Sequence, residues 1–371
     1  MTPVNYAAMD GETLLKELQG LAAREGASDL HLSPEKKFVR LEWRIHGVLT
    51  PLAELPHAVY VDFLRRVKFA SKLKLNITNV PQDGQYTFET DDKDHGSRAV
   101  NVRVATLPSR FGEALTLRLL DPKRGILPLE ALGFPQEVKS KLQELVELPH
   151  GLLLVTGPTG SGKTTTLYAL LSTIVGKERN IITLEDPVEY ELDGIIQSEI
   201  DAEHDFTFAG GLRSILRHDP DVILVGEIRD LETAQTAVNA ALTGHLVLST
   251  LHTNSAIEAI PRLLSMGVSP YTLAPALRGV LAQRLVRTLT PECSKSGTCD
   301  AGANASYGGQ MSIPELLLVS PAIREQILNM EQSAAIEKQA RTEGYETMSD
   351  WGEKIVAEGR TTREEVARVI G

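Results

Sequence analysis

The chain has 371 residues, of which 42% are hydrophobic and 23% charged, a balance that is typical of globular proteins and excludes a disordered or fibrous chain. Its formal net charge of −11 at pH 7 disfavours a protein that binds nucleic acid through its overall charge. The two cysteines, Cys293 and Cys299, are too few for a disulfide-framed secreted fold. We expect no signal peptide, because the start of the sequence lacks a basic patch followed by an apolar segment. We expect no membrane-spanning segment, because no apolar run approaches about 18 residues.

The first 120 residues predict a domain of mixed helices and strands. Apolar residues at helical spacing predict a helix over 11–25, and a second helical pattern, rich in lysine and arginine, covers 58–75. Alternating apolar and polar residues predict strands at 37–44, 85–90, 98–105 and 114–120. We therefore expect an α+β domain over residues 1–120.

A change of pattern follows this first domain. Residues 121–133 begin with two prolines and a glycine between patterned segments, which is typical of a linker. Residues 134–371 then open with helices alternating with strands that are apolar along their whole length. Such strands indicate a parallel sheet covered on both faces, and so an α/β fold. From about residue 256 onward we expect a helical region, broken by a polar, glycine-rich loop at 290–310.

A phosphate-binding motif stands where the first of these apolar strands ends. The segment GPTGSGKT fits the pattern GxxxxGK[ST], with the strand LLLVT before it and the helical segment TTTLYALLSTI after it. Glycines let backbone N–H groups turn toward phosphates, and the helix N-terminus adds its dipole. Lys163 is expected to reach the β- and γ-phosphates and the Thr164 hydroxyl to bind Mg²⁺. The expected nucleotide-binding residues are Gly157, Pro158, Thr159, Gly160, Ser161, Gly162, Lys163, Thr164 and Thr165.

Acidic residues end two of the later apolar strands. Glu227 follows the strand VILV, and a carboxylate at the carboxyl end of a parallel strand faces the ligand crevice, where it can hold Mg²⁺ through water or orient the attacking water. Another strand ends in the segment LEDPVEYE, whose acids could act as a general base toward water. Glu189 is the preferred candidate for this base, but the spacing of the acids does not exclude Glu185. Asp221, at the opposite end of its strand, is expected to be structural.

Two histidines, His245 and His252, flank the strand HLVLSTL. Polar residues at the end of a core strand can sense a γ-phosphate, although a histidine in such a place is often a satisfied core residue. Because the strand belongs to the expected phosphate-binding sheet, both are candidates for the site.

Four segments in this order, GPTGSGKT, EDPVEYE, LRHDPDVILVGEIRD and TGHLVLSTLHT, closely resemble the Walker A, Asp box, Walker B and His box of the type II secretion and type IV pilus ATPases. These proteins are hexameric RecA-like motors, and the resemblance runs from about residue 27 to the C-terminus. It implies a PAS-like N-terminal domain, a short hinge, and a RecA-like ATPase domain with a helical C-terminal region.

The resemblance also implies roles for individual residues. Glu189 takes the place of the glutamate that polarises water, Glu227 that of the Walker B glutamate, and His245 and His252 those of the His-box sensors. Arg103 and Arg118 match two arginines that approach the nucleotide from the N-terminal domain, where a guanidinium suits developing phosphate charge. Many relatives bind zinc through two CxxC pairs. The matching segment, CSKSGTC, holds only two cysteines, so we expect no zinc site.

The implied function is a homohexamer that hydrolyses Mg·ATP and drives an inner-membrane platform protein for pilus assembly or type II secretion. The implied location is cytoplasmic, peripheral at the inner membrane through partners. The segments PQDG, LPLEALGF and GRTTREEVARVIG favour this extension and secretion branch over the pilus-retraction branch. The segment PAIREQIL of this chain only loosely resembles the signature of the retraction branch. A DNA-translocating motor is disfavoured by the negative charge. A non-hydrolysing scaffold is disfavoured because Glu189 and Glu227 are both present.

Overall fold

The computed structural model describes residues 5–92, 96–296 and 306–371. The chain divides into two compact units, Met1–Gly125 and Ile126–Gly371. The boundary falls inside the expected linker 121–133, where the chain forms the short helices α3 (Pro122–Gly125) and η2 (Leu129–Leu132). Within the described ranges, every helix is too short or too polar to cross a bilayer.

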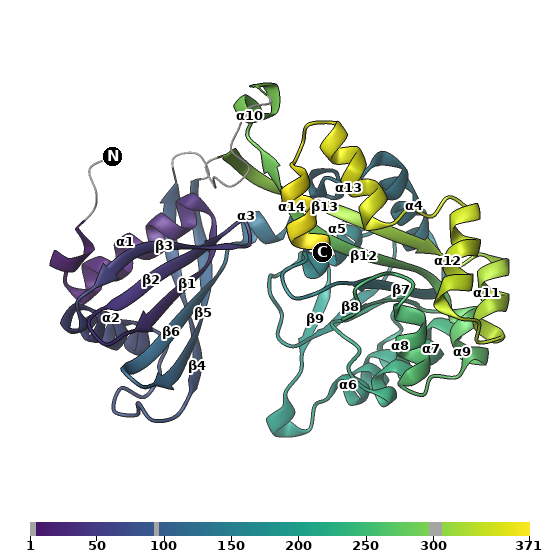
Figure 1. Ribbon diagram of the computed structural model, residues 1–371. Helices are drawn as coiled ribbons and strands as arrows, with labels where there is room; N and C mark the ends of the chain where they lie inside the picture. Colours follow the sequence, from purple (N-terminus) through teal and green to yellow (C-terminus); the bar gives the residue numbers. More distant parts are fainter. Residues whose placement is uncertain (1–4, 93–95, 297–305) are drawn as a thin grey trace. The chain divides into compact units, whose positions relative to one another are not determined.

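The N-terminal unit is a six-stranded antiparallel sheet with two packed helices (Figure 1). Its strand order is β3-β2-β1-β6-β5-β4. Its elements are η1 (Tyr6–Ala8), α1 (Gly11–Glu25), β1 (Ala27–Pro34), β2 (Val39–Ile45), β3 (Val48–Leu55), α2 (His57–Ala70), β4 (Gln82–Asp92), β5 (Gly96–Ser109) and β6 (Gly112–Leu120). The predicted α+β character is confirmed, although strand β1 was not expected.

Helix α1 shows why the sequence predicts these elements well. The side chain of Asp10 accepts a hydrogen bond from the backbone N–H of Thr13 and so caps the helix start. Gly26 ends the helix in the left-handed conformation, with φ of 71°. Leu14 and Leu18 on the predicted apolar stripe are buried against the sheet.

The C-terminal unit is built on a seven-stranded sheet in the order β13-β12-β7-β11-β10-β8-β9 (Figure 1). All neighbouring strands are parallel except β12 and β13. The strands are β7 (Gly151–Thr156), β8 (Ile181–Glu185), β9 (Ile196–Glu199), β10 (Val222–Val225), β11 (Leu246–Leu251), β12 (Leu277–Leu289) and β13 (Tyr307–Leu318). The predicted α/β fold with a parallel sheet is confirmed.

Helices cover both faces of this sheet, as the apolar strands predict. Along β7, Leu152 and Leu154 join one hydrophobic cluster, while Leu153 and Val155 join the other. One cluster includes α4 (Gln136–Glu147) and α5 (Lys163–Ser172), and the other includes α6 (Phe208–Ile215), α7 (Leu231–Leu242), α8 (Ala259–Ser265) and α9 (Pro270–Ala276). The unit also contains η3 (Ala202–His204) and η4 (Leu216–His218).

The prediction of a helical region from residue 256 is wrong for its middle part. Strands β12 and β13 form an antiparallel pair there, and only then do α11 (Pro321–Leu328), α12 (Ser333–Thr342), α13 (Met348–Ala357) and α14 (Arg363–Ile370) follow. The apolar run of β12 is buried on both faces, so its sequence lacks the alternation that marks a half-exposed strand. Within the expected loop 290–310, α10 (Pro291–Ser296) and the start of β13 are described, and residues 297–305 lie outside the described residues.

Candidate nucleotide site

The glycine-rich loop joins the end of β7 to the start of α5, as the motif predicts. Gly157, Gly160 and Gly162 have φ of 150°, 78° and 84°, a region that favours glycine. A Cβ atom at Gly157 would lie 2.5 Å from the Ser161 Oγ and 2.7 Å from the carbonyl oxygen of Gln283. The loop conformation therefore requires glycine where the sequence has it.

Lys163, the first residue of α5, lies over this loop. Its Nζ donates hydrogen bonds to the carbonyl oxygens of Gly157 at 2.9 Å and Pro158 at 3.1 Å. Burial lowers the pKa of Lys163; the nearby charges of Glu227 and Glu189 oppose this shift. The lysine thus sits at the helix start, within electrostatic reach of two carboxylates. An ammonium group so placed can neutralise a phosphate.

Gln283 on β12 braces the loop, and the sequence analysis did not identify it. Its Nε2 donates to the carbonyl oxygen of Ser161 at 2.6 Å, and its Oε1 accepts from the Thr166 hydroxyl at 2.9 Å. The residue is 1% exposed. This amide therefore connects the loop and helix α5 to the neighbouring strand. No signal for it was available while β12 was expected to be helical.

Glu227 lies just past the carboxyl end of β10, as expected. Its carboxylate forms an ion pair with Arg229, and its Oε2 lies 3.5 Å from the His252 Nε2. Arg229 also lies 3.7 Å from the Asp186 carboxylate. Because the register of the parallel strands aligns the ends of β7, β10 and β11, these groups gather at the edge of the sheet where the glycine-rich loop begins.

The two glutamates that spacing left unseparated have different surroundings. Glu185 ends β8, is 4% exposed, and accepts hydrogen bonds from the hydroxyls of Tyr168 and Thr183. Burial and the Glu185 charge raise the pKa of Tyr168. Glu189 lies in the loop after β8, where its backbone N–H binds the Tyr168 hydroxyl and its charge acts on Lys163. The Glu185 carboxylate is therefore already engaged in buried hydrogen bonds, and Glu189 is the better candidate for a general base.

The two candidate histidines lie at opposite ends of β11. His252 follows the carboxyl end, and the next residue, Thr253, donates its backbone N–H to the Thr156 hydroxyl at 2.9 Å. His245 precedes the amino end, where its Nδ1 lies 3.0 Å from the carbonyl oxygen of Ala240. Within this unit the structure brings His252 to the glycine-rich loop and does not bring His245 there. Strand direction, which the sequence analysis did not apply to this pair, accounts for the difference.

Arg103 and Arg118 belong to the N-terminal unit. They are paired across β5 and β6, and the Arg118 Nε donates to the Asp29 carboxylate at 2.8 Å. The Arg118 side chain is 53% exposed. Their action on a nucleotide stays a prediction.

The residues present suit Mg²⁺ bound together with a nucleotide. In the described part of the chain, no three His, Cys, Asp or Glu side chains converge to hold a metal by themselves. Mg²⁺ commonly takes one or two protein oxygens, with phosphate oxygens and water completing its shell. Thr164, in the first turn of α5, and Glu227 are the oxygen donors that would serve. Cys299 lies outside the described residues, so the expectation of no zinc site stays a prediction.

A glycine-rich loop between a buried parallel strand and a helix, with a lysine near strand-end carboxylates, defines a P-loop nucleotide-binding protein. Comparisons with known proteins identify the family within this class. A family model described as Type II/IV secretion system protein matches residues 10–368. The chain therefore belongs to the type II/IV secretion system protein family.

Named relatives lie on the secretion side of this family. The chain is 45% identical to Type II secretion system protein E of Pseudomonas aeruginosa, over 96% of this chain and 74% of the relative. It is 43% identical to Type II secretion system ATPase E of Vibrio cholerae, with the same coverage. The chain is an ATPase of this family, and the predicted resemblance is confirmed.

Solved structures of other ATPases share the fold. The pilus retraction motor PilT with bound ADP is 31% identical, with a TM-score of 0.67 and 95% of each chain covered. The Yersinia pseudotuberculosis ATPase DotB is 21% identical, with a TM-score of 0.78 over 99% of this chain and 96% of DotB, and shows likeness of fold alone. The higher identity to the type II secretion proteins favours the secretion and assembly branch, as the sequence motifs predicted.

Proposed function

We propose that this ATPase converts hydrolysis of Mg·ATP into mechanical work for a type II secretion or related pilus-type assembly machine. The observation that carries the proposal is the placement of Lys163 over the glycine-rich loop, with Glu227 and Glu189 close enough to act on its charge. In this proposal Lys163 binds the phosphates, Thr164 and Glu227 hold Mg²⁺, and Glu189 accepts a proton from the attacking water.

The assembly and its partners are part of the same proposal. We expect a homohexamer that acts on an inner-membrane platform protein from the cytoplasmic side, where ATP is available. Arg103 and Arg118 would supply positive charge as phosphate charge develops. Relatives named for type II secretion support the secretion machine as the setting.

The test is steady-state ATP hydrolysis measured against protein concentration, with sedimentation analysis of the same samples. We expect Mg²⁺-dependent turnover that rises as hexamers form. Lys163→Ala should reduce turnover at least about 10²-fold, because a preorganised charge at the phosphates is lost. Lys139→Ala, a matched change on α4 away from the loop, should keep the wild-type rate.

Two results would contradict the proposal. Turnover that persists in Lys163→Ala would show that ATP is not hydrolysed at the glycine-rich loop. Hexamers that bind ATP without hydrolysing it would favour a nucleotide-gated scaffold. A cellular test separates the branches of the family: deletion of the gene should abolish secretion or assembly, whereas an excess of pili would indicate retraction.

A further inference from the structure

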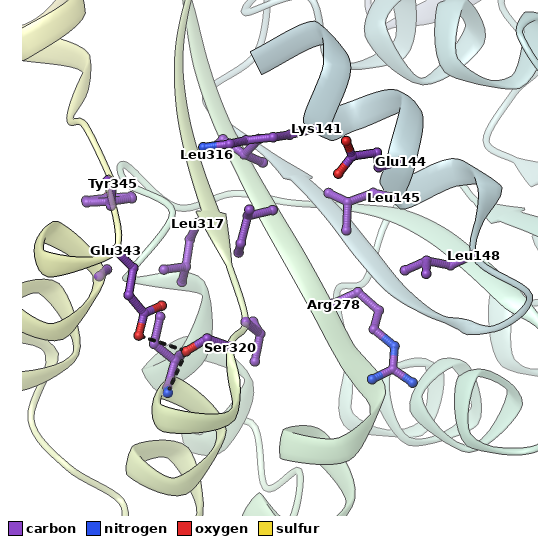
Figure 2. Close-up of a pocket in the computed structure, with 15 residues that line it drawn as sticks. Lys141, Glu144, Leu145, Leu148, Arg278, Leu316, Leu317, Ser320, Glu343 and Tyr345 are labelled. Carbon is purple, nitrogen blue, oxygen red and sulfur yellow. Dashed lines mark hydrogen bonds between the residues drawn. The ribbon is translucent and has the colours of Figure 1, made fainter. Parts of the chain in front are cut away.

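A cavity of about 430 Å³ opens in the C-terminal unit, between α4 and the ends of β12 and β13 (Figure 2). Leu145 and Leu148 of α4 form one wall, and Leu316 of β13 lies across from them. Glu343 and Tyr345, which follow α12, close the far side. Its volume lies within the range of small-molecule sites.

This cavity is separate from the nucleotide site. Arg278, which lines it, is the second residue of β12, and its stem crosses Gly151 at the start of β7. The glycine-rich loop follows the other end of β7. Gln283, which contacts that loop, is five residues further along β12, or about 17 Å at the usual rise of a strand. The two sites therefore lie at opposite edges of one sheet.

Arg278, which lines the cavity, and Arg324, whose charge acts on it, have no acidic partner among the described residues. In the described part of the chain, Arg278 makes one side-chain hydrogen bond, from Nε to the carbonyl oxygen of His150 at 3.4 Å, and forms no ion pair with a carboxylate. Arg324 on α11 follows the cavity-lining Ile323 and does not itself line the cavity; its Nε is buried and has no hydrogen-bond partner among the residues that the structure describes. Burial and the neighbouring Arg324 charge lower the pKa of Arg278. Two guanidinium groups are thus held near each other, and no described residue supplies a counter-ion to either.

The acidic residues that line the cavity do not neutralise these two arginines. The Glu343 carboxylate accepts hydrogen bonds from the Ser320 hydroxyl at 3.0 Å and from Gln339 at 2.7 Å. Glu144 stands on α4 three residues after Lys141, so these two opposite charges share one helix face and partly offset each other. The excess positive charge therefore stays at the Arg278 end of the cavity.

We propose that this cavity is a second ligand site, which binds a small organic anion through Arg278 and Arg324 and holds its aliphatic part against Leu145, Leu148 and Leu316. A guanidinium binds a carboxylate or phosphate through two parallel N–H donors. The leucine side chains favour a ligand with an apolar body over an inorganic ion. The proposal does not depend on what the ATPase drives.

The experiment titrates sodium octanoate into the purified full-length chain and measures binding by calorimetry. We expect a dissociation constant of about 1 mM, in keeping with a ligand of this size. 1-Octanol, which has the same alkyl chain but no charge, should bind the wild-type protein at least about tenfold more weakly than octanoate does. Octanoate should bind Arg278→Gln and Arg324→Gln at least about tenfold more weakly than it binds the wild-type protein. Arg262→Gln, an exposed arginine on α8 that does not line the cavity, is the matched control and should bind like wild type.

The location is tested without any substitution. A fatty acid of similar length carrying a diazirine should, on illumination, label peptides within 141–148 or 316–323 of the wild-type chain, and excess octanoate should prevent the labelling. Absence of octanoate binding at 10 mM, about ten times the expected constant, would overturn the proposal. So would equal binding of octanol, unchanged binding by both arginine variants, or labelling elsewhere.

Discussion

The two edges of the seven-stranded sheet carry similar residues in very different settings. At the carboxyl edge, Glu227 and His252 lie 3.5 Å apart beside the loop that Lys163 covers. At the amino edge, Asp221 accepts a hydrogen bond from the backbone N–H of Asn180 at 2.7 Å, and His245 lies against the carbonyl oxygen of Ala240. Strand direction therefore decides which acid and which histidine lie at the edge that carries the glycine-rich loop.

The largest expected effect at the carboxyl edge is at Glu189, in the loop after β8. Glu189→Gln should keep nucleotide binding and lose about 10²- to 10⁴-fold in turnover, as expected when a general base is removed. Single-turnover hydrolysis, with binding followed by a fluorescent ATP analogue, measures both effects. Glu185→Gln is the matched change and should leave turnover within about tenfold of wild type, because that carboxylate contacts Tyr168 and Thr183. A greater loss in Glu185→Gln than in Glu189→Gln would reverse the assignment.

A buried ion cluster supports β12 beyond the carboxyl edge, and it makes stability depend on pH. Glu365 of α14 accepts hydrogen bonds from Arg287 at 2.7 Å and from Arg368 at 2.7 Å. Burial raises the pKa of Glu365, but these hydrogen bonds outweigh it and lower the pKa from 4.5 to about 2. The carboxylate therefore stabilises the fold above pH 4.5 and loses this contribution as the pH falls toward 2.

The expected contribution of this cluster is about 3 kcal/mol of unfolding free energy. Urea unfolding at pH 7 and at pH 3 measures the larger part of it, about 2 kcal/mol, because the folded-state carboxylate is still mostly ionised at pH 3. Glu365→Gln should be less stable by about 3–5 kcal/mol at pH 7, because the buried Arg287 loses its carboxylate. It should also lose less stability than wild type between the two pH values. An equal acid-induced loss in both proteins would show that other groups cause it.

Replacing Gln283, which braces the glycine-rich loop, should have a smaller effect than replacing Glu189 or Glu365. Gln283→Leu leaves the carbonyl oxygen of Ser161 without its donor, and we expect kcat/KM for ATP to fall about tenfold. Thermal unfolding should change little by comparison, which separates an effect on the loop from a loss of fold. Gln136→Leu, at an exposed glutamine on α4, should behave like wild type. If both variants hydrolyse ATP equally, the loop does not need the amide.

The smallest expected effect distinguishes the two histidines. His252→Ala should lower turnover about two- to fivefold, since a partly exposed contact to Glu227 is worth little. His245→Ala should leave the rate of the isolated protein unchanged. Hydrolysis assays at one protein concentration compare the two directly. A larger effect at His245 would mean that the amino edge also takes part in turnover.

The parts of the site that sequence predicts well are those fixed by neighbouring residues. The glycine-rich loop needs only its own glycines, the strand before it and the helix after it, so Lys163 and Thr164 could be placed at once. The separation of Glu185 from Glu189 depends on Tyr168, which packs against Glu185 from a different element. Gln283 depends on the pairing of β12 with β7, and the sequence of β12 hid that pairing because it lacks a regular alternation of apolar and polar residues.

Strand β12 runs without interruption from Arg278 at one edge of the sheet, past Gln283, to Arg287 at the buried ion cluster. A strand alternates its side chains between two faces, so one inserted or deleted residue would exchange the faces of everything beyond it. Such a change would remove the brace on the glycine-rich loop and the partner of Glu365 together. Length variation among related sequences should therefore be absent from residues 277–289, even where the side chains themselves differ.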